Sequence, residues 1–569
     1  MRFLIEYFCE SVKINSQYLN LYILLPMKIR KIAKTALCGL MSVALVAVML
    51  TSCNKGGSNS ALLNNIPASA CFVLKMNPQQ VIESTGCSVE NGKIVLSEKY
   101  SEAIRNIEPT ALTMANAYLA YTEGLDLSSM ALFLTDMSRG SDIALVGAVS
   151  EPETVVKNLE TIIGVAGSER DGFVTFSVGG NGVIAVKDNL IWFANNLAII
   201  NRHIENAQDA SIASVAGVAE FLAEDDALAW MVSLPKVKED VEGNGYSIEQ
   251  ELIEEDVPAN LAGKIADVFN YNACVSFKLD GSTLCGRAYL VDDNGQRNEF
   301  GKMLNEIDPG FLANVPANAN SVIAMGSIAD EDVKDLIKDE ADRMRGRQYR
   351  AEEVEMLDFL TAWDGTAAMA FDTNDVYLDM SDVTSMNEQE IVMYIMQKIK
   401  MVAMVHLPSE MISKYTNSIC SLIQAANMPF NTVDTDYYSI EVPNAEVTGY
   451  FGNKNGYLTF GNCDGEGATN LSDIFAGQRM LYYFTQGANP MMAEYGWDFG
   501  SEGVFRVGDD IVEFNVTLTG TTANFLQAIF EPLTNPETIR KIQELVNAMD
   551  DYDNYYGYYS EEPEEDYCY

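Results

Sequence analysis

Short apolar runs, several of which alternate apolar and polar residues, recur along the chain between turns rich in Gly, Asn and Asp. This period of two predicts strands that are buried on one side. The clearest case is 182–194, where Lys187-Asp188-Asn189 joins two apolar runs and predicts a β-hairpin. The stretch 274–290 predicts a second hairpin around Asp280-Gly281.

The order of these elements recurs in the second part of the chain. Ile66-Pro67-Ala68-Ser69-Ala70 leads into a strand at 71–76, and Val315-Pro316-Ala317 leads into a strand at 321–325. We interpret this as one unit used twice, and the alternative is a single irregular α+β domain with recurrent strand–helix units. Four further pairs follow in the same order: 143–149 with 400–405, 182–194 with 447–461, 228–232 with 480–484, and 274–290 with 504–518.

The predicted fold class is α+β, with two related halves, each a largely antiparallel sheet covered by helices on one face. The halves are 61–308 and 311–548, separated by the breaker cluster Asp308-Pro309-Gly310. The last stretch, 551–569, is acidic and rich in tyrosine, and its composition predicts a disordered tail. Helices are predicted at 97–121 with a break near Pro109, at 298–307, at 522–530 and at 535–549.

A secretory leader is predicted at 27–52. A basic stretch from Met27 to Lys34 precedes an apolar run at 36–50, which is shorter than the roughly 20 residues that span a bilayer. Residues 1–26 fit no signal, so we interpret Met27 as the start of translation and 1–26 as an extension outside the translated chain.

The leader ends in Leu50-Thr51-Ser52-Cys53, which is typical of a lipoprotein signal that is cleaved between Ser52 and Cys53. Cys53 would then carry palmitate or another acyl chain and become the first residue of the mature protein. Several acyl chains on one cysteine hold a protein firmly at a membrane. Residues 53–60 are small and polar, which predicts a flexible tether.

The charge of the chain excludes one class of partner. The net charge is −44, and the 52 residues of the leader region hold six Lys/Arg and two Asp/Glu, so their removal lowers it to −48. Such a surface repels phosphate backbones, and nucleic acid is excluded as a partner. The 48% hydrophobic content is sufficient for ordinary cores.

Candidate chemistry is sparse. The two histidines, His203 and His406, lie in different halves, so no catalytic residues are assigned; His406 is interpreted as a helix cap. No metal-ligand spacing or cofactor motif occurs, and we expect no cofactor. Cys274 and Cys285 flank the turn of the second hairpin and either form a disulfide or remain free thiols.

One basic cluster interrupts the acidic sequence, and it consists of Arg343, Arg345, Arg347 and Arg350. These arginines either pair with acids of the same chain or form a docking site for an acidic partner or glycan.

The tethered cysteine, the Ile66–Ala70 start and the second start at Val315 resemble a Bacteroidetes lipoprotein family of unknown function, over about 60–550. The resemblance implies an outer-membrane lipoprotein of a Gram-negative bacterium and no particular activity. In such bacteria, surface-exposed lipoproteins tend to carry acids soon after the cysteine. Residues 54–60 contain none, which favours the periplasmic face.

Together these features predict a lipid-anchored cell-envelope protein that is more readily a binding protein than an enzyme. Its partners would be the membrane, through the lipid anchor, and an envelope protein or glycan. The alternative is a carboxylate-based hydrolase, for example one directed at glycans, with its site between the two halves.

Overall fold

The computed structural model describes residues 62–544 apart from internal gaps. The gaps are 91, 108, 136–142, 171, 179–181, 196, 198–199, 202–210, 244, 246, 255–258, 347–350, 377–389, 391–393, 396, 443–446, 466 and 543.

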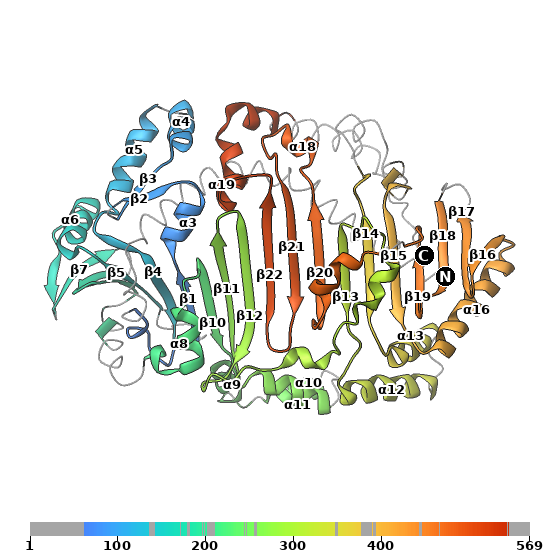
Figure 1. The fold of residues 1–569 in the computed structure, drawn as a ribbon. Coiled ribbons are helices and arrows are strands. Elements are labelled where there is room, and N and C mark those ends of the chain that lie inside the picture. Colours follow the sequence, from blue (N-terminus) through green and yellow to red (C-terminus); the bar gives the residue numbers. More distant parts are fainter. Residues whose placement is uncertain are drawn as a thin grey trace, which may run out of the picture.

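Within this part of the chain, twenty strands form one antiparallel sheet (Figure 1). The first ten strands are β1 (Phe72–Met76), β4 (Leu125–Leu134), β5 (Ile143–Val149), β6 (Ser168–Arg170), β7 (Phe173–Val178), β8 (Gly182–Lys187), β9 (Leu190–Ala194), β10 (Leu228–Ser233), β11 (Asn272–Asp280) and β12 (Thr283–Val291). The second ten are β13 (Ser321–Met325), β14 (Ala367–Asp372), β15 (Lys400–His406), β16 (Phe430–Asp434), β17 (Tyr437–Val442), β18 (Val447–Lys454), β19 (Tyr457–Gly461), β20 (Met480–Gln486), β21 (Gly500–Val507) and β22 (Val512–Thr519). The small hairpin of β2 (Ser88–Glu90) and β3 (Lys93–Val95) lies apart from the sheet.

The prediction of two halves with a sheet each is wrong, although the chain does combine helices with antiparallel strands. Strand β12 pairs with β22 from Thr283↔Thr517 to Ala288↔Val512, so the backbone hydrogen bonds continue from one part of the chain to the other. The boundary near Asp308 was placed from local turn signals, and these do not reveal which strand edges will pair. The cleft that the hydrolase alternative required between two halves is occupied by this strand pair.

Strand order is the same on the two sides of the β12–β22 junction. Central strand β1 lies between β4 and β10, and β13 lies between β14 and β20. The segments paired in the sequence comparison therefore lie on strands at the same distance from the β12–β22 junction, counted in strands. From edge to edge the order is β6, β7, β8, β9, β5, β4, β1, β10, β11, β12, β22, β21, β20, β13, β14, β15, β19, β18, β17 and β16.

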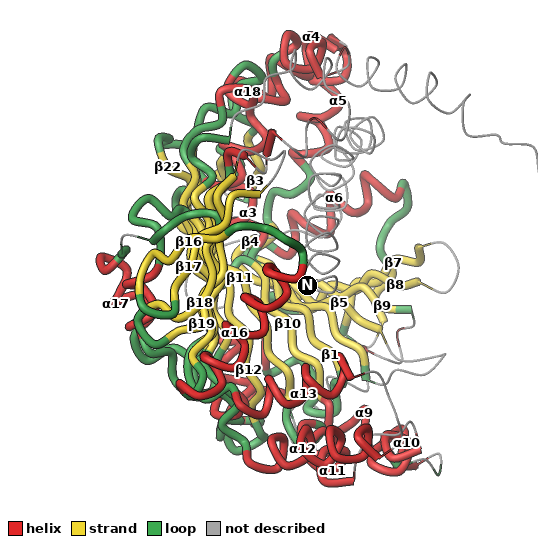
Figure 2. The backbone as a smooth tube through the Cα atoms, turned by 90° about the vertical axis from the view of Figure 1, so that its right-hand side faces the viewer, coloured by secondary structure: helices red, strands yellow, loops and turns green. Residues whose placement is uncertain are grey.

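Helices lie on both faces of the strongly twisted sheet and beside both ends of its strands (Figure 2). They are α3 (Pro78–Ser84), α4 (Glu98–Ile107), α5 (Pro109–Ala120), α6 (Pro152–Ile163), α8 (Ala216–Ala223), α9 (Leu234–Gly243), α10 (Ile248–Glu254), α11 (Ala259–Val268), α12 (Glu331–Gly346), α13 (Ala351–Ala362), α16 (Ser409–Ala425), α17 (Ser472–Phe475), α18 (Pro490–Ala493) and α19 (Phe525–Phe530). Short 3₁₀ turns are η1 (Ile212–Ser214), η2 (Phe300–Met303), η3 (Pro309–Asn314), η4 (Thr469–Leu471) and η5 (Glu531–Thr534).

The two faces of the sheet are covered differently. On one face, called here the α17 face, Phe475 of α17 packs over Val322 and Ala324, and α8 packs in the same way over β10, β11 and β12. On the opposite face, called here the α16 face, α6 covers β7 to β9, and α13 and α16 cover β15 to β19. In the middle of this face, α19 packs over one end of β11, β12 and β22. Because strand side chains alternate sides, the neighbours of Val322 and Ala324, such as Ile323, point to the α16 face.

Most predicted strands are confirmed, whereas one predicted helix is wrong. The stretch 298–307 contains only the 3₁₀ turn η2, although Phe300, Met303, Leu304 and Ile307 have helical spacing. The backbone after η2 pairs with other segments instead: Leu304 bridges Ile328, and the Asn305 and Ile307 N–H groups donate to the Ser327 and Gln478 carbonyls. Helix α5 begins at Pro109, where the break was predicted. The leader, the tether and the tail at 551–569 lie outside the described residues.

Candidate functional site

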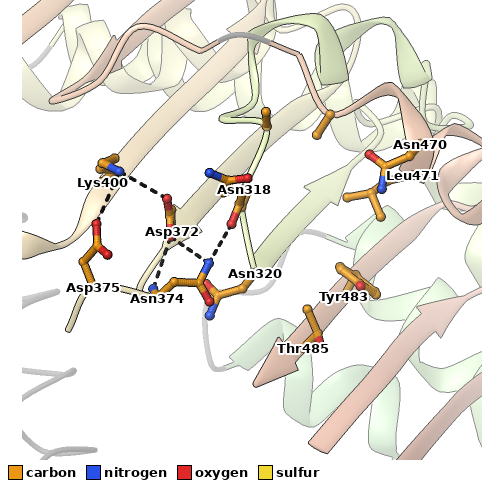
Figure 3. Close-up of a pocket in the computed structure, with 13 residues that line it drawn as sticks. Asn318, Asn320, Asp372, Asn374, Asp375, Lys400, Asn470, Leu471, Tyr483 and Thr485 are labelled. Carbon is orange, nitrogen blue, oxygen red and sulfur yellow. Dashed lines mark hydrogen bonds and ion pairs between the residues drawn. The ribbon is translucent and has the colours of Figure 1, made fainter. Parts of the chain in front are cut away.

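A pocket of about 350 Å³ opens at the ends of β13, β14, β15 and β20, on the α17 face (Figure 3). Its lining is mostly polar, with amides, two carboxylates, one lysine and one tyrosine. The polar lining residues are Asn318, Asn320, Asp372, Asn374, Asp375, Lys400, Asn470, Tyr483 and Thr485.

The antiparallel order of the strands brings these residues together. Asn320 directly precedes β13, Asp372 ends β14 and Lys400 begins β15. Since β13, β14 and β15 are neighbours with alternating directions, these three positions lie at the same end of the three strands. Tyr483 reaches the pocket from β20, the neighbour of β13 on the other side.

Lys400 links the two carboxylates. Its Nζ lies 3.5 Å from Asp372 Oδ2 and 3.6 Å from Asp375 Oδ2. The Asp372 side chain is only 5% exposed, whereas Asp375 is largely exposed. The charge of Asp372 raises the pKa of Lys400 above its usual value, so the lysine stays cationic. With Asp372 and Asp375 negative, the net charge of the pocket is −1.

Amide side chains fix the loop that follows β14. Asn374 donates from Nδ2 to Asp372 Oδ1 at 2.9 Å and to the Asn318 backbone carbonyl at 3.0 Å. Asn320 accepts from the Thr373 backbone N–H at 3.0 Å and donates to Thr373 Oγ1 at 2.9 Å. The wall of the pocket is therefore held in place by hydrogen bonds within the protein.

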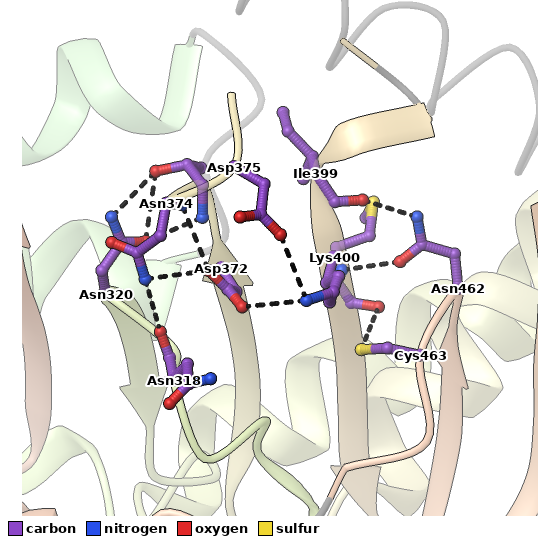
Figure 4. A network of polar contacts seen from close by, with 11 residues as sticks. Asn318, Asn320, Asp372, Asn374, Asp375, Ile399, Lys400, Asn462 and Cys463 are labelled. Carbon is purple, nitrogen blue, oxygen red and sulfur yellow. Dashed lines mark hydrogen bonds and ion pairs between the residues drawn. The ribbon is translucent and has the colours of Figure 1, made fainter. Parts of the chain in front are cut away.

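A second set of contacts holds the beginning of β15 (Figure 4). The Asn462 side chain accepts from the Met401 N–H and donates to the Ile399 carbonyl, both at 2.7 Å. Cys463 contacts the Met401 carbonyl through its thiol at 3.6 Å, and burial raises the pKa of this thiol to about 11. Lys400 thus lies on a backbone segment that is fixed on both sides.

Two amides remain available for a ligand. Among the described residues, the side chains of Asn318 and Asn470 are exposed, line the pocket and make no hydrogen bond within the protein. An amide offers both donors and acceptors, as a ligand hydroxyl does. Tyr483 adds an aromatic surface on the wall opposite Asp372 and Lys400 (Figure 3).

The predicted lipidation site Cys53 and the preceding residue Ser52 lie outside the described residues. The same holds for Arg347 and Arg350 of the basic cluster. The other two arginines lie on α12 and form ion pairs with acids of the same chain: Arg343 with Glu340, and Arg345 with Asp342 and Asp358. These ion pairs favour the interpretation in which the arginines pair internally.

The hairpin cysteines do not face each other. Cys274 lies opposite Tyr289, whereas Cys285 lies opposite Lys278, four residues along the same strand. Four residues of a strand span roughly 13 Å, which exceeds the Cα separation of about 7 Å that a disulfide tolerates. Both cysteines are free thiols, and burial raises the pKa of Cys274 to about 12.

His406 does not cap a helix. It ends β15, and its Nδ1 lies 2.8 Å from Asp364 Oδ1, while α16 begins after Pro408 without a side-chain cap. His203 lies in a gap of the described chain. Across the described ranges, acids, histidines and cysteines form no group that could hold a metal ion. No described helix combines the length and apolarity needed to cross a bilayer.

The polar pocket was not predicted from the sequence. Its residues are spread from 317 to 485, and only strand pairing unites them. The available signal was the clustering of short amide and acid residues where strands begin and end, as in Asn318-Ala319-Asn320 and Asp372-Thr373-Asn374-Asp375.

Comparisons of the chain with protein-family models, with curated proteins and with solved structures give no match, so its site is interpreted from its own residues.

Proposed function

We propose that the protein is a lipid-anchored envelope protein that binds a neutral, hydroxyl-rich ligand, such as a glycan segment, in the pocket between β14 and β20. The anchor is Cys53, and the binding site faces the periplasm. The protein acts by binding and carries out no reaction at this site.

The observation that supports this proposal most directly is the preformed, amide-rich wall of the pocket. Asn320 and Asn374 are fixed by hydrogen bonds within the protein, so ordering them on binding costs little conformational entropy. Asn318 and Asn470 remain available to exchange hydrogen bonds with a ligand. A pocket with a net charge of −1 and one paired cation suits an uncharged ligand better than a phosphate or a carboxylate.

The arrangement of the carboxylates supports binding over hydrolysis. A carboxylate-based glycosidase uses one protonated acid and one carboxylate on opposite sides of the scissile bond. Asp372 and Asp375 are both ion-paired with the same Lys400, and Asp372 is almost fully buried. Asp372 therefore has little access to a ligand, and the exposed Asp375 has no second accessible carboxyl group opposite it in the pocket.

The test uses residues 54–569, which retain every described contact, and a panel of neutral and charged oligosaccharides. We expect neutral sugars to bind. The double variant Asn318→Ala, Asn470→Ala should weaken their binding about thirtyfold, since it removes two hydrogen bonds worth about 1 kcal/mol each. Asn431→Ala on the edge strand β16 is the matched control, because Asn431 is exposed and lies four strands beyond β15. Calorimetry measures the binding.

Two results would contradict the proposal. Equal binding by the double variant and by the control would place the ligand elsewhere. Release of shortened sugars, abolished by Asp375→Asn, would show that the site is catalytic.

A further inference from the structure

The middle of the α16 face carries a line of aromatic side chains that share no buried cluster with a described helix. Helix α19 packs beside this line, over Leu279, Leu284 and Val516. Strand register places Phe277, Phe514, Phe505 and Tyr482 side by side on β11, β22, β21 and β20, with Gly286 of β12 between the first two. We call these four side chains the aromatic row. Apolar residues continue the line on both sides, with Leu228 on β10 and Ile323 on β13.

The aromatic row is packed at its base but open above. The rings of Phe277 and Phe514 lie 5.7 Å apart, and Trp230 lies 5.2 Å from Phe277. Phe505 is 36% exposed, and the other three members are half-buried. Among the described residues, none of the four belongs to a buried core cluster. An apolar surface of this extent usually marks an interaction site.

Acidic helices border this surface. Helices α9 to α13 lie along one end of the strands, on the side of the α16 face (Figures 1 and 2). Together they hold 17 Asp/Glu and 7 Lys/Arg, and α10 and α13 contain no cation at all. An apolar floor beside an acidic border complements a partner that is apolar on one side and cationic on the other.

We propose that the aromatic row docks a cationic amphipathic helix of a partner protein. Charge complementarity selects this occupant. A second copy of the chain would add a further net charge of −44, and an anionic lipid headgroup would lie beside the same acidic border, so both would be repelled. The apolar face of such a helix would cover the aromatic row, and its Lys and Arg side chains would reach the acids of α9 to α13.

The dimensions suit a short helix. The row crosses five adjacent strands, a width of roughly 19 Å at the usual strand spacing. An α-helix of about 13 residues has this length. The row lies on the face opposite to the polar pocket, so the two sites are independent.

The test measures binding of an 18-residue Leu/Lys peptide with helical periodicity to residues 54–569, by fluorescence anisotropy. A scrambled peptide of the same composition and a Leu/Glu peptide are the peptide controls. We expect the Leu/Lys peptide to bind more than tenfold tighter than either, with an affinity that falls as salt increases. Phe505→Asp should weaken this binding at least tenfold, and Met114→Asp on α5, another exposed apolar position, should not.

Each alternative occupant gives a different result, and each would overturn the proposal. Flotation with phosphatidylcholine or phosphatidylglycerol vesicles that depends on Phe505 would indicate a lipid. A dimer in sedimentation that Phe505→Asp dissociates would indicate a second copy. Equal binding of the scrambled peptide, or no effect of a Phe505→Asp variant with wild-type urea stability, would exclude the row as a helix site. Asn318→Ala reports separately on the polar pocket.

Discussion

At the scale of single residues, the most unusual feature is a lysine inside the sheet. Lys75 of β1 is only 1% exposed, and its Nζ donates to the Glu224 backbone carbonyl at 2.5 Å. Asp226 lies nearby and is ion-paired with Arg287 at 2.8 Å. Burial lowers the pKa of Lys75 to about 8, although Asp226 and its neighbours partly oppose this shift.

The lowered pKa predicts a dependence of stability on pH. Between about pH 8 and pH 10.5 the folded protein loses the Lys75 proton while the unfolded chain retains it, so stability rises with pH in this window. Lys75→Met should reduce this slope by up to about 1.4 kcal/mol per pH unit. Urea unfolding at pH 7, 8, 9 and 9.5 measures the slope.

Lys278→Met on the adjacent part of the sheet is the control, because Lys278 is exposed. An unchanged slope in Lys75→Met, together with normal folding, would show that the buried lysine does not titrate in this window.

Prediction from the sequence was least successful at the residue scale. Alternation marked Cys274 and Cys285 as neighbours of a turn, but the register that separates them is set by all nine residue pairs of the hairpin. In the same way, nothing local to Asp372 indicated that Lys400 would lie beside it. Side-chain partners depend on strand pairing, which the period of apolar residues does not specify.

At the scale of elements, glycines shape the aromatic row. A side chain at Gly286 would overlap the ring of Phe514 on the neighbouring strand, and one at Gly503 would overlap Phe484. These glycines allow the rings to lie close to the backbone of the sheet.

Gly286→Ala should therefore destabilise the protein by about 1–3 kcal/mol, the usual cost of overpacking. Gly508→Ala, where the nearest atom beyond the chain neighbours is 3.5 Å away, should change stability little. Adding Phe514→Leu to Gly286→Ala should restore part of the loss. Thermal or urea unfolding compares the four proteins, and a double variant no more stable than Gly286→Ala would contradict this account.

Elements themselves were predicted well where an alternating run had a clear turn beside it. The hairpin of β8 and β9 and the strand β13 have the predicted positions. Strands β4 and β14 were not predicted, since β4 ends in the continuous apolar run 130–134 and β14 mixes alanine with larger residues. Runs of this kind are compatible with a buried helix as well as with a strand.

At the scale of the whole molecule, the β12–β22 pair decides the architecture. Paired backbone amides of β12 and β22 should exchange with solvent as slowly as those of the β11–β12 pair, since both ladders run without a register shift. Hydrogen exchange with mass spectrometry measures this. Fast exchange confined to the junction would indicate two sheets that merely touch, and the amides of β16 provide the fast reference.

The two ends of the strand order have a consequence for assembly. Within the described chain, β6 and β16 each have one strand neighbour, so each presents unpaired backbone groups to solvent. Strand β6 is only three residues long and contains Glu169 and Arg170, and β16 has an irregular register between Thr432 and Asp434. Short, charged or irregular edges resist the addition of further strands. A sheet of twenty strands can therefore remain a single molecule at high concentration without growing sideways into fibres.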